Sequence, residues 1–132
     1  MRVIGLATAA ILISTNVFAD GAFGIWKTEE KDDGRFLHVE MHPCADKPAQ
    51  ICGTIAGAFN GASQANIGKP IIWDMEPHAR KTNRWDDGKI WKVDDDKIYN
   101  SGMKLRADGI LEVSGCILGG LICKSQEWTP VK

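Results

Sequence analysis

The sequence has no excess of basic residues. Its 132 residues include 16 Lys and Arg against 17 Asp and Glu, which gives a formal net charge of −1. The longest block of like charge is the triplet Asp94-Asp95-Asp96. A nucleic-acid-binding domain normally carries a clustered basic surface and a high pI. The composition therefore predicts no nucleic-acid partner, and without an EF-hand pattern around it the triplet is interpreted as a polar turn.

Long hydrophobic runs are also absent. The apolar stretch of residues 3–13 is too short for a membrane-spanning helix, which needs about 20 apolar residues. It follows the basic residue Arg2 and leads to the small and aliphatic positions of residues 17–19, an order that is typical of a secretory signal peptide. We therefore expect residues 1–19 to be cleaved, and residues 20–132 to form one periplasmic domain with no transmembrane segment.

No catalytic motif is present in the sequence. It lacks the Gly-x-Ser-x-Gly nucleophile elbow, and its serines stand in no recognisable active-site context. Carboxylates are numerous, but their positions in the sequence do not pair them as acid and base. Because function resides in a particular site rather than in a fold, we predict no catalytic residue and no cofactor, and an enzyme is the less favoured class.

The number and position of the cysteines are typical of an exported protein. Cys44, Cys52, Cys116 and Cys123 all lie in the mature part, and an even number in a small secreted chain indicates disulfides. Three pairings are possible, of which we favour the local ones, Cys44–Cys52 and Cys116–Cys123. Zinc ribbons prefer cysteine pairs about two to four residues apart, and these wider spacings do not fit that pattern.

The pattern along the mature chain predicts strands and no long helix. Residues 35–42 alternate between apolar and polar side chains with period two, as a half-buried strand does. Further strands are predicted at residues 23–28, 51–58, 69–73, 89–93, 97–107, 110–117 and 121–131. An irregular middle part is expected at residues 60–68 and 74–84, with a helical turn in the second segment. Asp108-Gly109 predicts a two-residue hairpin turn, and the whole predicts an all-β fold, a small antiparallel barrel of about eight strands.

Short motifs spread over the chain resemble one family. Gly24-Ile25-Trp26 is similar to the Gly-x-Trp signature of lipocalin-type barrels, in which the Trp closes one end. The other motifs are, in order, Pro43-Cys44, Ile51-Cys52-Gly53-Thr54-Ile55, Gly68-Lys69-Pro70, Trp85-Asp86-Asp87-Gly88-Lys89-Ile90, Lys97-Ile98-Tyr99, Gly115-Cys116 and Gln126-Glu127-Trp128-Thr129. Together they resemble the domain of unknown function 2147 family of small exported Gram-negative proteins, over residues 22–131. The resemblance implies a lipocalin-like barrel and, by analogy, binding of a lipid or another small molecule.

Aromatic and apolar strand residues are the candidates for a binding pocket, because such pockets are concave and mostly apolar. Three of the five Trp residues lie in or beside the irregular middle part, where a barrel mouth is expected. The candidate ligand-binding residues are Trp73, Trp85, Trp91, Tyr99, Met103, Leu37, Val39 and Met41. The alternative for each is a place in a plain packed core. Gly24, Trp26 and Trp128 are assigned structural roles, with the two Trp rings closing the core.

His38, Glu40 and His42 point to one side of a predicted strand, because residues two apart share a face. Such a set is chemically able to hold zinc or copper. We favour the simpler interpretation, a solvated face, and predict no bound metal.

The leading hypothesis for function is an exported barrel that binds a small apolar, amphipathic or lipid-like molecule. The alternatives are an envelope interaction or structural module with a packed interior, and a His-dependent metal-binding protein. The ligand and the oligomeric state stay open at this level.

Overall fold

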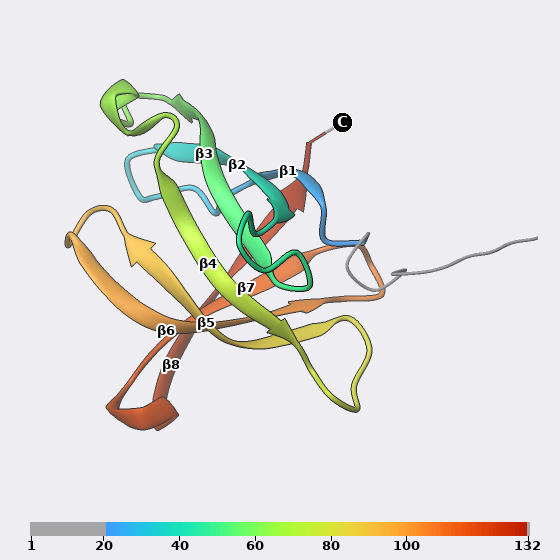
Figure 1. The fold of residues 1–132 in the computed structure, drawn as a ribbon. Helices are drawn as coiled ribbons and strands as arrows, with labels where there is room; N and C mark the ends of the chain where they lie inside the picture. Colours follow the sequence, from blue (N-terminus) through green and yellow to red (C-terminus); the bar gives the residue numbers. More distant parts are fainter. Residues whose placement is uncertain (1–20, 132) are drawn as a thin grey trace, which may run out of the picture.

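The computed structural model describes residues 21–131, so the predicted signal peptide lies outside the described residues. Eight antiparallel strands follow one another in chain order and close into a barrel (Figure 1). The strands are β1 (Gly24–Lys27), β2 (Phe36–Pro43), β3 (Ile51–Phe59), β4 (Pro70–Pro77), β5 (Arg84–Lys92), β6 (Lys97–Leu105), β7 (Leu111–Ile117) and β8 (Ile122–Pro130). The prediction of an all-β antiparallel barrel of about eight strands is confirmed.

Short 3-10 turns are the only helical elements between residues 21 and 131. They are η1 (Gln64–Asn66), between β3 and β4, and η2 (Leu118–Gly120), between β7 and β8. None of the helical elements in the described part of the chain is long or apolar enough to cross a membrane.

The Asp108-Gly109 pair forms the β6–β7 turn, but the turn is longer than predicted. Leu105 pairs with Leu111, so residues 106–110 connect the two strands. Gly109 has a positive φ of 85°, whereas Asp108 is not among the positive-φ residues. The Asp108 side chain instead accepts a hydrogen bond from the Ile110 N–H at 3.2 Å. The position of the turn was therefore predicted correctly, and its two-residue form was wrong.

The irregular segment expected at residues 74–84 is mostly strand, because β4 continues to Pro77 and β5 begins at Arg84. Asp74 and Asp87 adopt φ values of 60° and 62°. Near these residues β4 has an additional residue relative to β3, and β5 has one relative to β6. Such bulges break the period-two pattern that identifies a strand in the sequence. The expected helical turn in this segment is absent, since the described residues 78–83 form a plain connection.

Large side chains fill one end of the barrel. Trp26, Trp85, Met41 and Met75 are all buried there, in one apolar cluster. The Trp26 indole N–H donates to the Ala22 carbonyl at 2.9 Å, which ties the segment before β1 across this end. Burying aromatic rings of this size dominates the energetics of a small core, so this end of the barrel is the stable base for the rest.

Glycine allows the strands to pack closely at the filled end of the barrel. A Cβ on Gly88 would lie 2.5 Å from the Met75 sulfur and 3.0 Å from the Trp73 carbonyl oxygen. A Cβ on Gly115, in contrast, would meet nothing nearer than 3.7 Å. β5 can therefore pass Met75 only where it carries no side chain, whereas the neighbourhood of Gly115 is loosely filled.

Both favoured disulfides are present and that prediction is confirmed. Cys44–Cys52 joins the end of β2 to the start of β3, and Cys116–Cys123 joins directly opposed residues of β7 and β8. Each closes a short loop, which stabilises the folded state by about 2–3 kcal/mol through the lost entropy of the unfolded chain.

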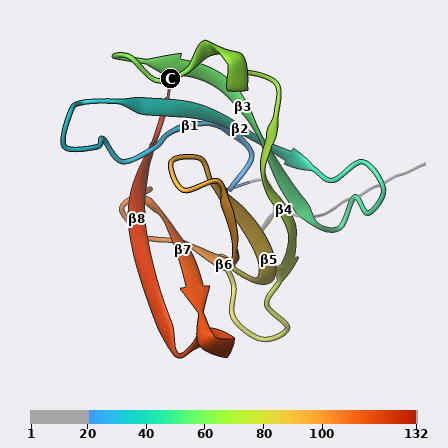
Figure 2. The ribbon, with the colours of Figure 1, turned by 90° about the vertical axis from the view of Figure 1, so that its left-hand side faces the viewer.

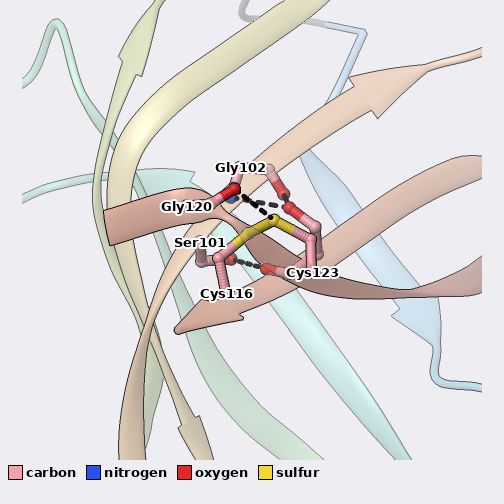
Figure 3. The surroundings of a disulfide bond; sticks show 6 residues. Ser101, Gly102, Cys116, Gly120 and Cys123 are labelled. Atoms are coloured by element: carbon pink, nitrogen blue, oxygen red, sulfur yellow. Dashed lines mark hydrogen bonds between the residues drawn. A yellow bond between two sulfur atoms is a disulfide. The ribbon is translucent and has the colours of Figure 1, made fainter. Parts of the chain in front are cut away.

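Hydrogen bonds fasten β6 to β7 beside the second disulfide (Figure 3). The Ser101 hydroxyl donates to the Ser114 carbonyl, and the Gly102 N–H donates to the Ser114 hydroxyl at 3.1 Å. The β7–β8 hairpin is therefore held to β6 by these hydrogen bonds, and its own two strands are joined by the disulfide.

The outer face of β2 and β3 carries an aromatic cluster. The Phe36 and Phe59 rings stack with their centroids 4.9 Å apart, and the His38 ring lies 4.4 Å from Phe59. The Lys27 ammonium lies 4.5 Å from the centre of the Phe36 ring. Partial burial, together with the charge of Lys27, lowers the pKa of His38.

We predict that Gly88→Ala lowers the free energy of unfolding by about 1–3 kcal/mol, the usual cost of overpacking. Gly115→Ala is the matched control, because its new methyl group meets only ordinary contacts, and it should change stability by less than about 0.5 kcal/mol. Urea titrations of the two variants and the parent measure the difference. Equal stabilities for the two variants would contradict the packing described for β5 against Met75.

We also predict that lowering the pH from about 7.5 to about 5.5 reduces stability, and that His38→Gln removes part of this loss. The unfolded ring takes up a proton near its ordinary pKa of about 6.5, whereas the folded ring takes it up only at lower pH. Between these two values the unfolded state binds more protons, so acid favours unfolding. Urea titrations at the two pH values give the comparison, and an unchanged pH dependence in the variant would refute the burial effect.

Candidate ligand-binding site

Four connections surround the end of the barrel opposite the packed core (Figure 2). They are the β1–β2 loop, the β3–β4 loop with η1, the β5–β6 turn and the β7–β8 hairpin tip with η2. In Figure 1 all four lie on the left, away from the connections of the packed end. We call this end the mouth.

A cavity of about 510 Å³ lies inside the barrel at the mouth. This volume falls within the range of about 300–1,000 Å³ that is usual for small-molecule sites. Residues from three of these connections, all except the β7–β8 tip, line it together with strand residues. The lining residues are Thr28, Glu29, Lys31, Arg35, Phe36, Leu37, Ala62, Ser63, Asn66, Ile71, Ile90, Trp91, Lys92, Val93, Asp94, Tyr99, Val113, Gly115, Ile117, Ile122, Lys124, Ser125, Gln126 and Trp128.

The deep part of the cavity is apolar. Leu37, Ile71, Ile90 and Val113 contribute aliphatic surface, and Trp128, which is only 1% exposed, separates the cavity from the packed core. Placing an apolar chain against such surface is favourable by about 25 cal/mol for each Å² removed from water.

The structure divides the predicted ligand-binding residues into two groups. Leu37, Trp91 and Tyr99 line the cavity. The other five, none of which lines it, are Val39, Met41, Trp85 and Met103, which are buried, and Trp73, which is partly exposed on β4. The residues that were assigned structural roles divide as well, because Trp128 lines the cavity, while Trp26 lies in the core and Gly24 is exposed at the start of β1.

The bulge at Asp87 explains why Ile90, and not only Trp91, belongs to the cavity. Strict alternation from the buried Trp85 would give residues 87, 89 and 91 the same inward orientation. The additional residue in β5 shifts the alternation by one, so that residues 88 and 90 face inward instead. Met75 fills the space beside Gly88, and Ile90 approaches the inner side of Gly115. Trp91 reaches the cavity at its rim, where the Lys69 ammonium lies 5.7 Å from the ring.

Ion pairs tie two of the mouth loops together. Lys31 on the β1–β2 loop lies 2.8 Å from Asp94 on the β5–β6 turn, and Arg35 lies 3.7 Å from the same carboxylate. Lys92 pairs with Asp95 at 3.0 Å, and their hydrogen bond raises the pKa of Lys92 and lowers that of Asp95. Exposed pairs of this kind contribute at most about 1 kcal/mol each, so they position the loops more than they stabilise the fold.

The wall formed by β7 and β8 changes in polarity from floor to rim. Opposed pairs on these strands, which share a sheet face, are Leu111–Trp128, Val113–Gln126, Gly115–Lys124 and Ile117–Ile122. The floor pair is therefore apolar, the middle of the wall carries an amide and an ammonium group, and the rim is apolar again. Beyond the rim, Leu118 and Leu121 at the hairpin tip are 65% and 84% exposed.

Lys124 and Gln126 were not singled out from the sequence. The alternation in residues 121–131 indicates a strand but not which face turns inward, because small and polar residues occupy both phases. The feature that identifies Lys124 is its position directly opposite Gly115, and this position is known only once the register of the β7–β8 hairpin is known.

The stripe of His38, Glu40 and His42 lies on the outer face of β2. The described part of the chain, residues 21–131, contains no group of three His, Cys, Asp or Glu side chains arranged to hold a metal ion. The His42 ring is engaged at 2.8 Å with the Thr54 hydroxyl, and His38 packs on Phe59. The geometry thus offers no metal centre on this strand.

Comparison with solved structures places the fold among known barrels. Protein HP1028 from the human pathogen Helicobacter pylori, described as belonging to the lipocalin family, superposes with a TM-score of 0.64. Its sequence is 15% identical, and the match covers 83% of this chain and 82% of that one. The likeness concerns the fold. No curated protein matches the chain significantly.

A family model agrees with the motifs found in the sequence. The model described as "Uncharacterized protein conserved in bacteria (DUF2147)" matches residues 24–130, from the first residue of β1 to the last residue of β8. The chain therefore belongs to the DUF2147 family of bacterial proteins.

Proposed function

We propose that the protein is an exported binding barrel, which takes one small amphipathic or lipid-like molecule into the cavity at its mouth. The observation that carries the proposal is the cavity itself: about 510 Å³, apolar in its depth and polar towards its opening. An eight-stranded barrel is wide enough to hold one small ligand or to be filled by its own side chains. Here the side chains fill only the end around Trp26 and Trp85.

The cavity favours this proposal over an interaction module with a packed interior. Protein cores are normally close-packed, with few voids larger than a water molecule. A barrel filled by its own side chains would leave no hollow of several hundred Å³, whereas a concave and partly apolar hollow of this size is the usual form of a small-molecule site. The lipocalin-like neighbour supports the same proposal through its fold alone.

Export is part of the proposal. A signal peptide ending at Ala19 would deliver residues 20–132 to the periplasm, an oxidising compartment in which both disulfides persist. The bacterial family and the two disulfides support this location.

We predict that decanol changes the tryptophan fluorescence of the protein in a saturable manner, because Trp91 and Trp128 line the cavity. Leu37→Gln should weaken decanol binding by roughly tenfold, equivalent to about 1.4 kcal/mol, by placing an amide on the apolar wall. Ile98→Gln is the matched control, since Ile98 lies on a neighbouring part of the barrel but is 61% exposed and outside the cavity. No saturable change in the parent, or equal losses in both variants, would rule out binding in the cavity.

We further predict that the protein recovered from the periplasm begins at Asp20. Small residues before the cleavage point are what signal peptidase accepts, and Ala19 supplies one. Intact-mass spectrometry before and after reduction gives both the first residue and the number of disulfides. A mass that retains residues 1–19 would exclude cleavage, and recovery only from the cytoplasm would exclude export.

A further inference from the structure

Lys124 is a solvent-exposed lysine whose side chain starts on the inner face of the barrel. It lies directly opposite Gly115 in the β7–β8 register. The inner side of Gly115 faces Ile90 and Tyr99, each 3.7 Å from the place where a Cβ would stand. Because opposed residues of an antiparallel pair project to the same side of the sheet, the Lys124 side chain starts towards the same space. It is also among the residues that line the cavity.

The other cations of the cavity wall already have anionic partners. Lys31 and Arg35 share Asp94, and Lys92 pairs with Asp95. Among the described residues 21–131, Lys124 makes no ion pair. Of the four cations on the cavity wall, three therefore already have a carboxylate partner.

The carboxylate of Glu29 does not supply the missing partner. One of its oxygens accepts a hydrogen bond from the Glu127 N–H at 3.0 Å, which holds it to β8 beyond the Lys124 position. Glu29 and Lys124 form no ion pair in the structure. The ammonium group is thus the one cavity-lining cation, within residues 21–131, whose charge no side chain balances.

The cavity wall around Lys124 also carries hydrogen-bond donors. Gln126 lies two residues along β8 on the same face, and its Oε1 accepts from the Trp128 indole at 2.9 Å. This orientation leaves the Gln126 amide NH₂ to donate elsewhere. Tyr99, whose Cβ lies beside Gly115, also lines the cavity, and its phenol can donate a hydrogen bond. An ammonium, an amide NH₂ and a phenol together suit a ligand group that accepts hydrogen bonds and carries negative charge.

We infer that the ligand is an anionic amphiphile, with an acidic head group at Lys124 and an apolar chain against Leu37, Ile71 and Ile90. The inference rests on the proposed function and adds the charge and the orientation of the ligand. The carboxylate of a fatty acid is the simplest head group of this kind. Its charge would balance Lys124, while the chain would displace water from the aliphatic depth of the cavity.

The test compares three probes that share one chain: decanoate, decanol and decylamine. Tryptophan fluorescence titrations at low and high salt give the affinities. We expect decanoate to bind most tightly, roughly three- to tenfold better than decanol, and decylamine to bind most weakly. The preference for decanoate over decanol should shrink at high salt, since screening weakens an exposed charge pair.

Variants of two lysines distinguish a specific contact between Lys124 and the head group from a general effect of positive charge near the mouth. Lys124→Gln should abolish the preference for decanoate over decanol, and Lys124→Arg should retain it. Lys97→Gln is the matched control, because it removes an equal charge beside the β5–β6 turn from an exposed residue that does not line the cavity. It should leave the preference in place.

The possible failures are distinguishable. If decanol binds as well as decanoate, or if Lys97→Gln abolishes the preference as fully as Lys124→Gln does, the inference is wrong and the proposed function stands. If none of the three probes binds in the cavity, the inference and the proposed function are both overturned.

Discussion

The pairing of β1 with β8 is the contact on which the rest of the structure depends. It is short, with Trp26 opposite Pro130 and Lys27 opposite Thr129, and the Val131 N–H donates to the Ile25 carbonyl beside it at 2.9 Å. Without this ladder the sheet would have two free edges and no enclosed interior. With it, every strand has two neighbours, and the inward-facing side chains must either fill the space between them or leave it hollow.

Both outcomes occur, one at each end. Near Trp26 and Trp85 the interior is filled by aromatic rings and by the thioethers of Met41 and Met75, and Gly88 removes the last side chain for which there is no space. Towards the mouth the inward positions carry smaller or more polar residues, with Gly115 as the clearest case. A stable base therefore supports an open half that can exchange contacts with a ligand without loss of the fold. The Cys116–Cys123 bridge secures the hairpin that forms one wall of that half.

Much of this architecture could be predicted because it follows from local chemistry. The alternation in β2, the Gly-containing turns and the short cysteine spacings each have a physical reason that a single sequence displays. The strands are interrupted at two aspartates, Asp74 in β4 and Asp87 in β5, and the prediction from the sequence was wrong there. Both aspartates adopt a left-handed backbone that Asp tolerates, and the apolar pattern around them does not show that the strands continue through these positions. The candidate site shares this limit, because Leu37, Trp91 and Tyr99 were predicted from their types, whereas Lys124 has meaning only when it is known to face Gly115.

The central claim is that a ligand enters the barrel from the mouth and lies above Trp128. An NMR titration of ¹⁵N-labelled, oxidised protein with decanoate tests it most directly. We expect amide shift changes at inward positions of the open half, such as Leu37, Ile90 and Gln126, with the packed end around Met75 unchanged. Changes confined to the outer face around His38 and Phe59, or no saturable change at all, would contradict it.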